Sequence, residues 1–211
     1  HGFVLDGAGN KMSKSLGNVI DPLNVCKEMG ADILRLWVAS SEYTSDIRVS
    51  KDILRQCAEA YRKIRNTFRF LLGNLSDFNN KLDSISYDKL GEVDQYMLCK
   101  LNSLIEKVYN AYDNYNYDEV YKLIINYITN DLSAFYLDFT KDILYIEEKN
   151  NIQRRSIQTV LFAHLDSLLR LITPIIPFTS EEIYSYMNVD DKLESSYLLD
   201  MPEIKVYENS S

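Results

Sequence analysis

The sequence predicts an all-α protein, in which a helix bundle follows a small connective segment with one short strand. Long stretches place apolar residues three or four positions apart, which is the spacing of a helix that buries one face. The 211 residues include only 7 Gly and 4 Pro, which excludes a collagen-like or Pro/Gly-rich disordered chain. Hydrophobic residues make up 46% and charged residues 26%, a balance that provides a core without disulfide or metal staples. We expect a connective segment (1–50), a bundle (51–188) and a polar tail (189–211).

Two short helices are predicted in the connective segment, after a strand and a loop. Asp21 before Pro22 is the pattern of a helix N-cap followed by proline at the first helical position. Gly30 is a typical residue just beyond a helix end. The expected elements are a strand (2–6), a turn (6–10), a polar loop (11–18), a helix ending at Met29, a helix (31–40) and a polar loop (41–49).

Four long amphipathic helices are predicted from residue 51 onward. In the first of them Ile53, Cys57, Tyr61 and Ile64 recur at helical spacing. Two prolines end the fourth helix, and a capping box from Thr179 to Glu182 starts a short fifth one. The tail is expected to be held loosely. The long helices are expected over about 51–75, 93–115, 118–145 and 152–172.

Charge is distributed unevenly along the chain. The net charge is −8, which argues against a surface coated with basic residues for indiscriminate nucleic-acid binding. Residues 1–75 hold 11 Lys/Arg and 8 Asp/Glu, a net +3, so residues 76–211 carry the remaining −11. A local basic patch is therefore expected in the first part of the chain.

Several classes of protein are excluded by what the sequence lacks. No apolar run approaches the ~18 residues that span a bilayer, and the first residues do not resemble a signal peptide. The 3 cysteines form no CxxC pair, so we expect reduced thiols in the cytoplasm and neither a zinc knuckle nor a disulfide framework. The chain opens without Met in what reads as a strand, so we expect a fragment of a longer protein. His164 lies on the apolar face of its helix and is expected to be a core histidine and not a metal ligand.

The loop after the first strand has the composition of an anion clamp. It reads Lys11-Met12-Ser13-Lys14-Ser15, with glycines on both sides. Lysine is a compact cation on a flexible stem, and such groups can stabilise charge that develops on a polyphosphate. Taken as a bare K-x-x-K, the same pattern is more often a solvated loop.

These five residues match the KMSKS signature of the class I aminoacyl-tRNA synthetases letter for letter. A five-letter match by chance in a chain of this length is roughly a one-in-ten-thousand event. The flanking run resembles the isoleucyl branch of the subclass that also handles valine, leucine and methionine. Further similar stretches are YRKIRNT (61–67), DLSAFYLD (131–138) and PIIPFTSEEI (174–183), so the resemblance covers about residues 1–200.

This resemblance implies a function for the parent protein, which is ligation of isoleucine to its tRNA with ATP and Mg²⁺. It implies that Lys14 helps to stabilise the departing pyrophosphate, that Lys11 supports the loop and the nucleotide, and that Met12, Ser13 and Ser15 belong to the ATP-contacting loop. It also implies a class Ia anticodon-binding bundle that binds tRNA(Ile), in a protein expected to be a monomer without a membrane contact. The second family signature, HIGH, does not occur in this sequence. We therefore expect this chain alone to be inactive, with the amino-acid pocket, the editing site and the zinc module outside it.

The first long helix carries a stripe of arginines. At about 100° per residue, Arg55, Arg62, Arg65 and Arg69 fall within about 80° of one another, opposite the apolar residues. Arginine suits phosphate and base edges, because it is planar and always charged. A charged outer face is also ordinary on any bundle helix. Together with the resemblance, the stripe predicts tRNA contacts at Arg62, Arg65, Asn66 and Arg69.

Two alternatives remain open at this point. The parent protein could be a valyl-, methionyl- or leucyl-tRNA synthetase, which the amino-acid pocket would decide. The chain could also be a non-catalytic tRNA-binding helical module, although the intact lysine signature argues against a decayed site.

Overall fold

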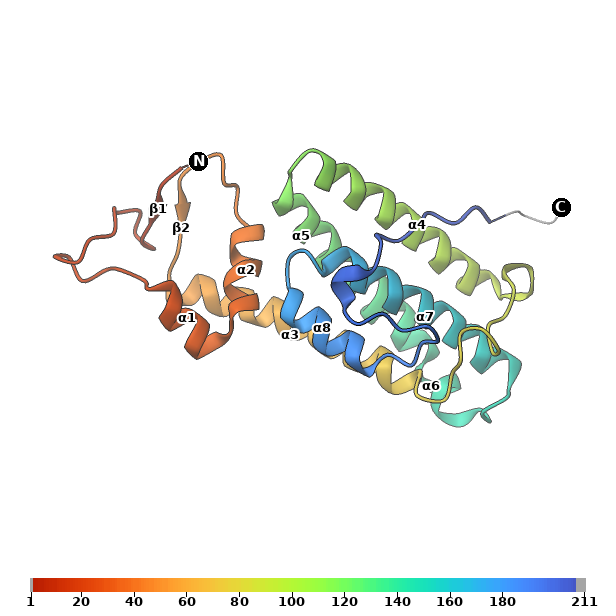
Figure 1. Ribbon diagram of the computed structural model, residues 1–211. Helices are drawn as coiled ribbons and strands as arrows, with labels where there is room; N and C mark the ends of the chain where they lie inside the picture. The colour runs from red at the N-terminus through yellow and green to blue at the C-terminus, as the bar shows by residue number, and fades with distance from the viewer. Residues whose placement is uncertain (1, 208–211) are drawn as a thin grey trace.

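A computed structural model of the protein describes residues 2–207, and it confirms the all-α bundle. His1 and residues 208–211, the outer ends of the predicted first segment and tail, lie outside the described residues. Figure 1 shows the bundle on one side and the connective segment on the other, with α2 between them. The loop with the two lysines lies at the end of the segment that points away from the bundle (Figure 1).

The connective segment contains a two-stranded parallel sheet, of which only one strand was predicted. β1 (Val4–Leu5) pairs with β2 (Ile47–Arg48), with Val4 opposite Ile47. The polar-loop prediction for 41–49 is therefore wrong at β2, because the partner strand lies more than 40 residues away in sequence. Gly2 is required at the start of this sheet, since a Cβ there would overlap the backbone of Ser45. α1 (Pro22–Met29) and α2 (Ala31–Ala39) follow the predicted boundaries closely.

Among residues 2–207, the bundle is built from three long helices and several shorter ones, and only the connection between the first two long helices (75–91) is itself long. Ser50 caps the first of them, since its hydroxyl accepts a hydrogen bond from the Ile53 amide. The helices are α3 (Lys51–Asn74), α4 (Glu92–Asp113), α5 (Tyr117–Asn126), α6 (Asp138–Ile146), α7 (Ile152–Ile172) and α8 (Pro177–Tyr186), with short 3₁₀ turns η1 (Tyr87–Lys89) and η3 (Ser196–Leu198).

The predicted third long helix is continuous but changes its winding in the middle. Between α5 and α6 the chain forms a π-helix, η2 (Tyr127–Leu137). Tyr136 in this stretch is fully buried, and its hydroxyl donates a 2.6 Å hydrogen bond to Asp94 of α4. Ser133 shares a 3.1 Å hydrogen bond with Thr67 of α3. These contacts with α3 and α4 accompany a winding that is rare in proteins and that the local sequence does not favour over an α-helix.

Two hydrophobic cores meet along α3. The small core belongs to the connective segment and the first turns of α3, and the large core fills the bundle. Tyr61 packs against both cores, so it marks their junction. The members of the small core are Val25, Ile33, Trp37, Val49, Leu54, Cys57 and Ala58.

The predicted capping box at the start of the last helix is wrong. α8 begins at Pro177, two residues earlier, with Ile176 as an N-cap that provides no side-chain hydrogen bond. Thr179 therefore lies inside the first turn, where its amide and hydroxyl both donate to Asp32 of α2. The contact was not predictable from the local pattern, because the two residues are 147 positions apart.

The expectation of a loosely held tail is also wrong for the described part of the chain. Residues 199–207 lie across α4 and α7, and Pro202 is buried. The ring of Tyr207 stacks on Tyr87 at a centroid distance of 4.2 Å. The polar composition of the tail did not predict these contacts, because most of them are made by backbone carbonyls and by one aromatic ring.

Candidate nucleic-acid interface and lysine loop

The α3 arginines lie on the outer face of the bundle, as the helical spacing predicts. Arg55, Arg62, Arg65 and Arg69 are all exposed. Arg55 and Arg62 form ion pairs within α3, with Asp52 and Glu59 respectively. Exposed pairs of this kind contribute at most about 1 kcal/mol, so they leave these guanidinium groups available to other anions.

Arg65 differs from the preceding arginines because it reaches a second helix. Its Nη2 lies 3.2 Å from Oε1 of Glu182 on α8. Arg69, one turn further along α3, has no ion pair among residues 2–207. The arginine stripe therefore ends beside α8 with one bridging guanidinium and one unpaired one.

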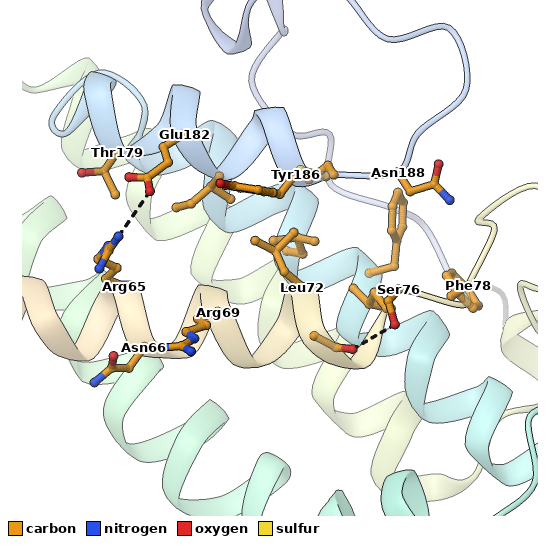
Figure 2. Close-up of a pocket in the computed structure, with 16 residues that line it drawn as sticks. Arg65, Asn66, Arg69, Leu72, Ser76, Phe78, Thr179, Glu182, Tyr186 and Asn188 are labelled. Carbon is orange, nitrogen blue, oxygen red and sulfur yellow. Dashed lines mark hydrogen bonds and ion pairs between the residues drawn. The ribbon is translucent and has the colours of Figure 1, made fainter.

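A half-open groove of about 700 Å³ separates α3 from α8. Arg65, Asn66 and Arg69 line it from α3, and Tyr186 lines it from α8 (Figure 2). Apolar side chains from α3, α7 and the connection after α3 also line it: Leu72, Leu75, Phe78, Phe162 and Leu165. The structure thus brings together three of the four predicted tRNA-contacting residues, and Arg62 lies outside this groove.

An exposed aromatic pair lies on the η2–α6 stretch. Phe135 is 43% exposed and Phe139 is 59% exposed, and their rings stack with centroids 6.4 Å apart. A second hollow, of about 310 Å³, lies next to this stretch, and Asn66 lines both hollows. Neither phenylalanine is among the residues that the sequence predicts to contact RNA. The spacing of four residues between Phe135 and Phe139 was the only available signal.

The lysine loop is shaped by hydrogen bonds from Asn18 and Asp6. The Asn18 amide group accepts from the Ser13 amide at 2.9 Å and donates to Asp6 at 2.9 Å. Asp6 also accepts from the amides of Ala8 and Asn10. These hydrogen bonds, above all the one from the Asn18 side chain, lower the pKa of the Asp6 carboxyl below its usual value. The carboxylate thus stays ionised and holds the base of the loop.

Both lysines of the loop are exposed. Lys11 Nζ lies 5.8 Å from the centre of the Phe3 ring, and Lys14 has no ion pair among the described residues. Met12 and Ser13 are half-buried, and Ser13 Oγ lies 3.1 Å from Ser15 Oγ. Two ammonium groups without an ion pair among the described residues, on a loop that also carries two hydroxyls, are a donor set that fits a polyphosphate.

His164 is a buried core residue, as expected. Its Nδ1 donates to the Val160 carbonyl at 2.7 Å, so the neutral ring accepts from the Tyr127 hydroxyl at Nε2, 2.8 Å away. Burial lowers the pKa of His164 to about 4. Within the part of the chain that the structure describes, no group of three or more His, Cys, Asp or Glu residues is placed to hold a metal ion. No helix there is long and apolar enough to cross a bilayer.

Comparison with known proteins matches both parts of the chain to tRNA ligases. Residues 1–50 match the class I tRNA synthetases (I, L, M and V), and residues 94–210 match the anticodon-binding domain of tRNA ligase. The chain is 56% identical over 207 residues to isoleucine–tRNA ligase of Desulforamulus reducens, covering 98% of this chain and 22% of the relative. It is 58% identical over 203 residues to the isoleucine–tRNA ligase of Bacillus cytotoxicus, again covering 22% of that protein. The predicted resemblance to the isoleucyl branch is confirmed at the level of sequence similarity.

Solved structures show the same fold at lower identity. A leucyl enzyme of Agrobacterium radiobacter, solved as a ternary complex with tRNA, aligns with a TM-score of 0.66 at 24% identity over 88% of this chain and 21% of its own. Methionyl-tRNA synthetase of Mycobacterium tuberculosis aligns with a TM-score of 0.69 at 21% identity over 85% of this chain and 36% of its own. Since the anticodon-binding pattern alone matches more than half of its residues, the chain belongs to the family of anticodon-binding domains of tRNA ligases.

Proposed function

We propose that this chain binds the anticodon stem and loop of a tRNA across the groove between α3 and α8. The observation that carries the proposal is that Arg65, Asn66 and Arg69 line one groove with an apolar lining. The guanidinium groups would bind phosphates, and the apolar lining would receive an unstacked base. Phe135 and Phe139 offer rings on which further bases stack. Arg62 would contribute from outside the groove.

The proposed parent activity is ligation of isoleucine to tRNA(Ile), which the similarity to isoleucine–tRNA ligases supports. The chain spans about 22% of the length of these relatives. We propose that the isoleucine pocket lies in another part of the parent protein. We propose that the parent protein acts as a monomer in the cytoplasm. This chain alone, which lacks the HIGH signature, would not catalyse the reaction.

In the proposed reaction, Lys11 and Lys14 bind the phosphates of ATP. Mg²⁺ would arrive with the nucleotide and neutralise part of the phosphate charge. Lys14 would hold the pyrophosphate as it leaves, while Lys11 and the residues Met12, Ser13 and Ser15 support the nucleotide. The Asp6–Asn18 hydrogen bond would hold the base of the loop while the lysines move.

Removing the two groove arginines tests the proposed RNA interface. We expect Arg65→Ala with Arg69→Ala to weaken tRNA binding by the chain about 10- to 100-fold, because each charged hydrogen bond to phosphate contributes about 1.5–3 kcal/mol before solvent screening. The slope of log K against log salt should become shallower by about 1 to 2. Filter binding or anisotropy at several salt concentrations provides both values. The same measurement with a tRNA for another amino acid tests whether the chain prefers tRNA(Ile).

Arg55→Ala is the matched control, because Arg55 is exposed on the same helix and lies outside the groove. It should change the affinity less than about 3-fold. If the double variant and the control bind tRNA equally well, the groove is not the interface.

Neutralising the lysine loop tests the proposed ATP contacts. In the full-length ligase, Lys14→Ala should slow isoleucine-dependent pyrophosphate exchange by about 100- to 1,000-fold, since one transition-state donor is removed. Affinity for tRNA should stay unchanged, because the loop lies far from the groove. Normal exchange in this variant would remove Lys14 from the reaction.

A further inference from the structure

The contacts between the connective segment and the bundle converge on α2. One side of this short helix places Ile33 and Trp37 in the small core. The other side places Leu36 and Ala39 in the large core. Because α2 belongs to both cores, its position determines how the segment with the lysine loop is oriented on the bundle.

Asp32 of α2 completes the amino-terminal end of α8. Its Oδ2 accepts from the amide and from the hydroxyl of Thr179, both at 2.6 Å. Thr179 is in the first turn of α8, where the amide groups lack partners within the helix, and the N-cap residue Ile176 offers no side-chain acceptor. A carboxylate at this place is also favoured by the helix dipole. One helix is thus capped by a side chain of another.

A chain of hydrogen bonds extends this contact to α3. The Thr179 hydroxyl gives its proton to Asp32, so the Tyr61 hydroxyl must donate to Thr179 Oγ1, 2.9 Å away. Tyr61 is the residue at which the two cores meet. Arg35, also on α2, donates to the carbonyls of Pro174 and Ile175 just before α8. The position of α8 relative to α2 and α3 is therefore defined by directed polar contacts as well as by packing.

Asp32 makes both of its hydrogen bonds to α8 through a single carboxylate oxygen. Asp32 is 6% exposed, and its second oxygen, Oδ1, has no hydrogen-bond partner among the described residues. A neutral acceptor could cap α8 without leaving a carboxylate oxygen unpaired.

The helix that Asp32 caps is also one wall of the groove. One turn after Thr179, Glu182 of α8 meets Arg65 of α3, and Tyr186 lines the groove further along. Figure 2 shows Thr179, Glu182 and Tyr186 along this wall, with Arg65 opposite. A tilt of α8 about its amino-terminal end would change the groove and its orientation relative to the connective segment.

We propose that Asp32 is a positioning residue for the aminoacylation step, which it serves by fixing the groove wall α8 relative to the segment that holds the lysine loop. The inference rests on the proposed function. An RNA held in the groove is then presented to the catalytic side at one defined angle. Asp32 is buried and does not line the groove, so we expect adenylate formation, which needs no tRNA, not to depend on it.

The test compares two steps of the full-length ligase. We expect Asp32→Ala to raise the KM for tRNA in aminoacylation about 10-fold, which corresponds to about 1.4 kcal/mol of alignment free energy. Pyrophosphate exchange should stay within about 2-fold of the wild-type rate. Thr179→Val, which keeps the backbone amide but removes the hydroxyl, should show the same selective effect at about 3-fold, and Thr179→Ser should restore the wild-type values.

Asp94→Asn is the matched control for a purely structural role. Asp94 also accepts a 2.6 Å hydrogen bond from a hydroxyl, but its partner Tyr136 lies within the bundle. This variant should lower the melting temperature without raising the KM for tRNA selectively. The inference is overturned if Asp32→Ala slows both steps equally, if it slows neither, or if Asp94→Asn produces the same selective loss.

The remaining outcomes distinguish a failure of the positioning role from a failure of the proposed RNA interface. If Asp32→Ala does not accumulate as folded protein, the Thr179 pair decides by the same comparison of KM and exchange. If the groove arginine variants lose tRNA binding while the Asp32 and Thr179 variants behave as wild type, only the positioning role fails. If the arginine variants bind tRNA normally, the proposed interface itself fails.

Discussion

At the scale of single residues, His164 links the stability of the bundle to pH. The neutral ring is held between the Tyr127 hydroxyl and the Val160 carbonyl, and its pKa falls to about 4. In the unfolded chain the same group titrates near its ordinary value of about 6.5. Between these two values the unfolded state binds the proton and the folded state does not, so the free energy of unfolding decreases as the pH falls from about 6.5 to about 4.

We expect this one group to remove on the order of 3 kcal/mol of stability by pH 4, since each pKa unit corresponds to about 1.4 kcal/mol. Denaturant unfolding at several pH values between 7.5 and 4 measures the loss. His164→Gln lowers stability at neutral pH but should show a smaller decrease on acidification. Carboxylates such as Asp77 titrate in both proteins, so they cancel in the comparison. Identical pH dependences would contradict the buried neutral histidine.

The candidate site could be predicted from the sequence only in part, for a reason visible at individual residues. Helical spacing predicts that Arg65 and Arg69 are exposed, because the face of a helix follows from its period. The groove needs α8 as well, and Glu182 lies 117 positions from Arg65. Local sequence carries no information about that distance. The aromatic pair Phe135 and Phe139 escaped prediction in the same way, since its exposure depends on how η2 packs.

At the scale of secondary structure elements, local signals predicted the helices that have clear ends. Pro22 begins α1 and Gly30 ends it. Ser50 caps α3, at the point where long amphipathic helices begin in the sequence. The missed features are all long-range. β2 needs its partner β1, the cap of Thr179 comes from α2, and the π-helix η2 lies between contacts to α3 and α4.

The tail provides an element-scale prediction. Residues 200–207 are held by Arg170, Tyr109 and Asn102, which donate to the backbone carbonyls of Asp200, Pro202 and Lys205, and by the stack of Tyr207 on Tyr87. Each of these four contacts contributes about 1 kcal/mol, and the freed side chains regain some conformational entropy. Ending the chain after Leu199 should therefore destabilise the bundle by about 3 kcal/mol. Thermal unfolding should show a fall in Tm of roughly 6–12 °C.

Two point variants distinguish the stabilising effect of the Tyr207 contact from an effect of chain length alone. Tyr207→Phe keeps the stacked ring and should melt close to wild type, whereas Tyr207→Ala should lose about 1 kcal/mol. If the shortened chain melts at the wild-type temperature, the tail does not stabilise the bundle.

At the scale of the whole molecule, an acidic chain is proposed to bind an acidic partner. The net charge of −8 opposes RNA at long range, so we expect the attraction to come from Arg62, Arg65 and Arg69 of α3. We therefore expect a shallow salt dependence, with a slope of about −2 to −3, set by a few phosphate contacts. A slope as steep as that of a protein coated with basic residues would require a second basic surface.

The central claim, that RNA occupies the face between α3 and α8, is tested most directly by amide hydrogen exchange of the chain with and without an anticodon stem-loop RNA. We expect protection on binding at residues 65–73 of α3 and at residues 182–188, which cover the end of α8 and the two positions after it, together with little change in α4 and in residues 199–207. Protection confined to α4 and that last stretch, or no protection in the groove at RNA concentrations that saturate the chain, would contradict the claim.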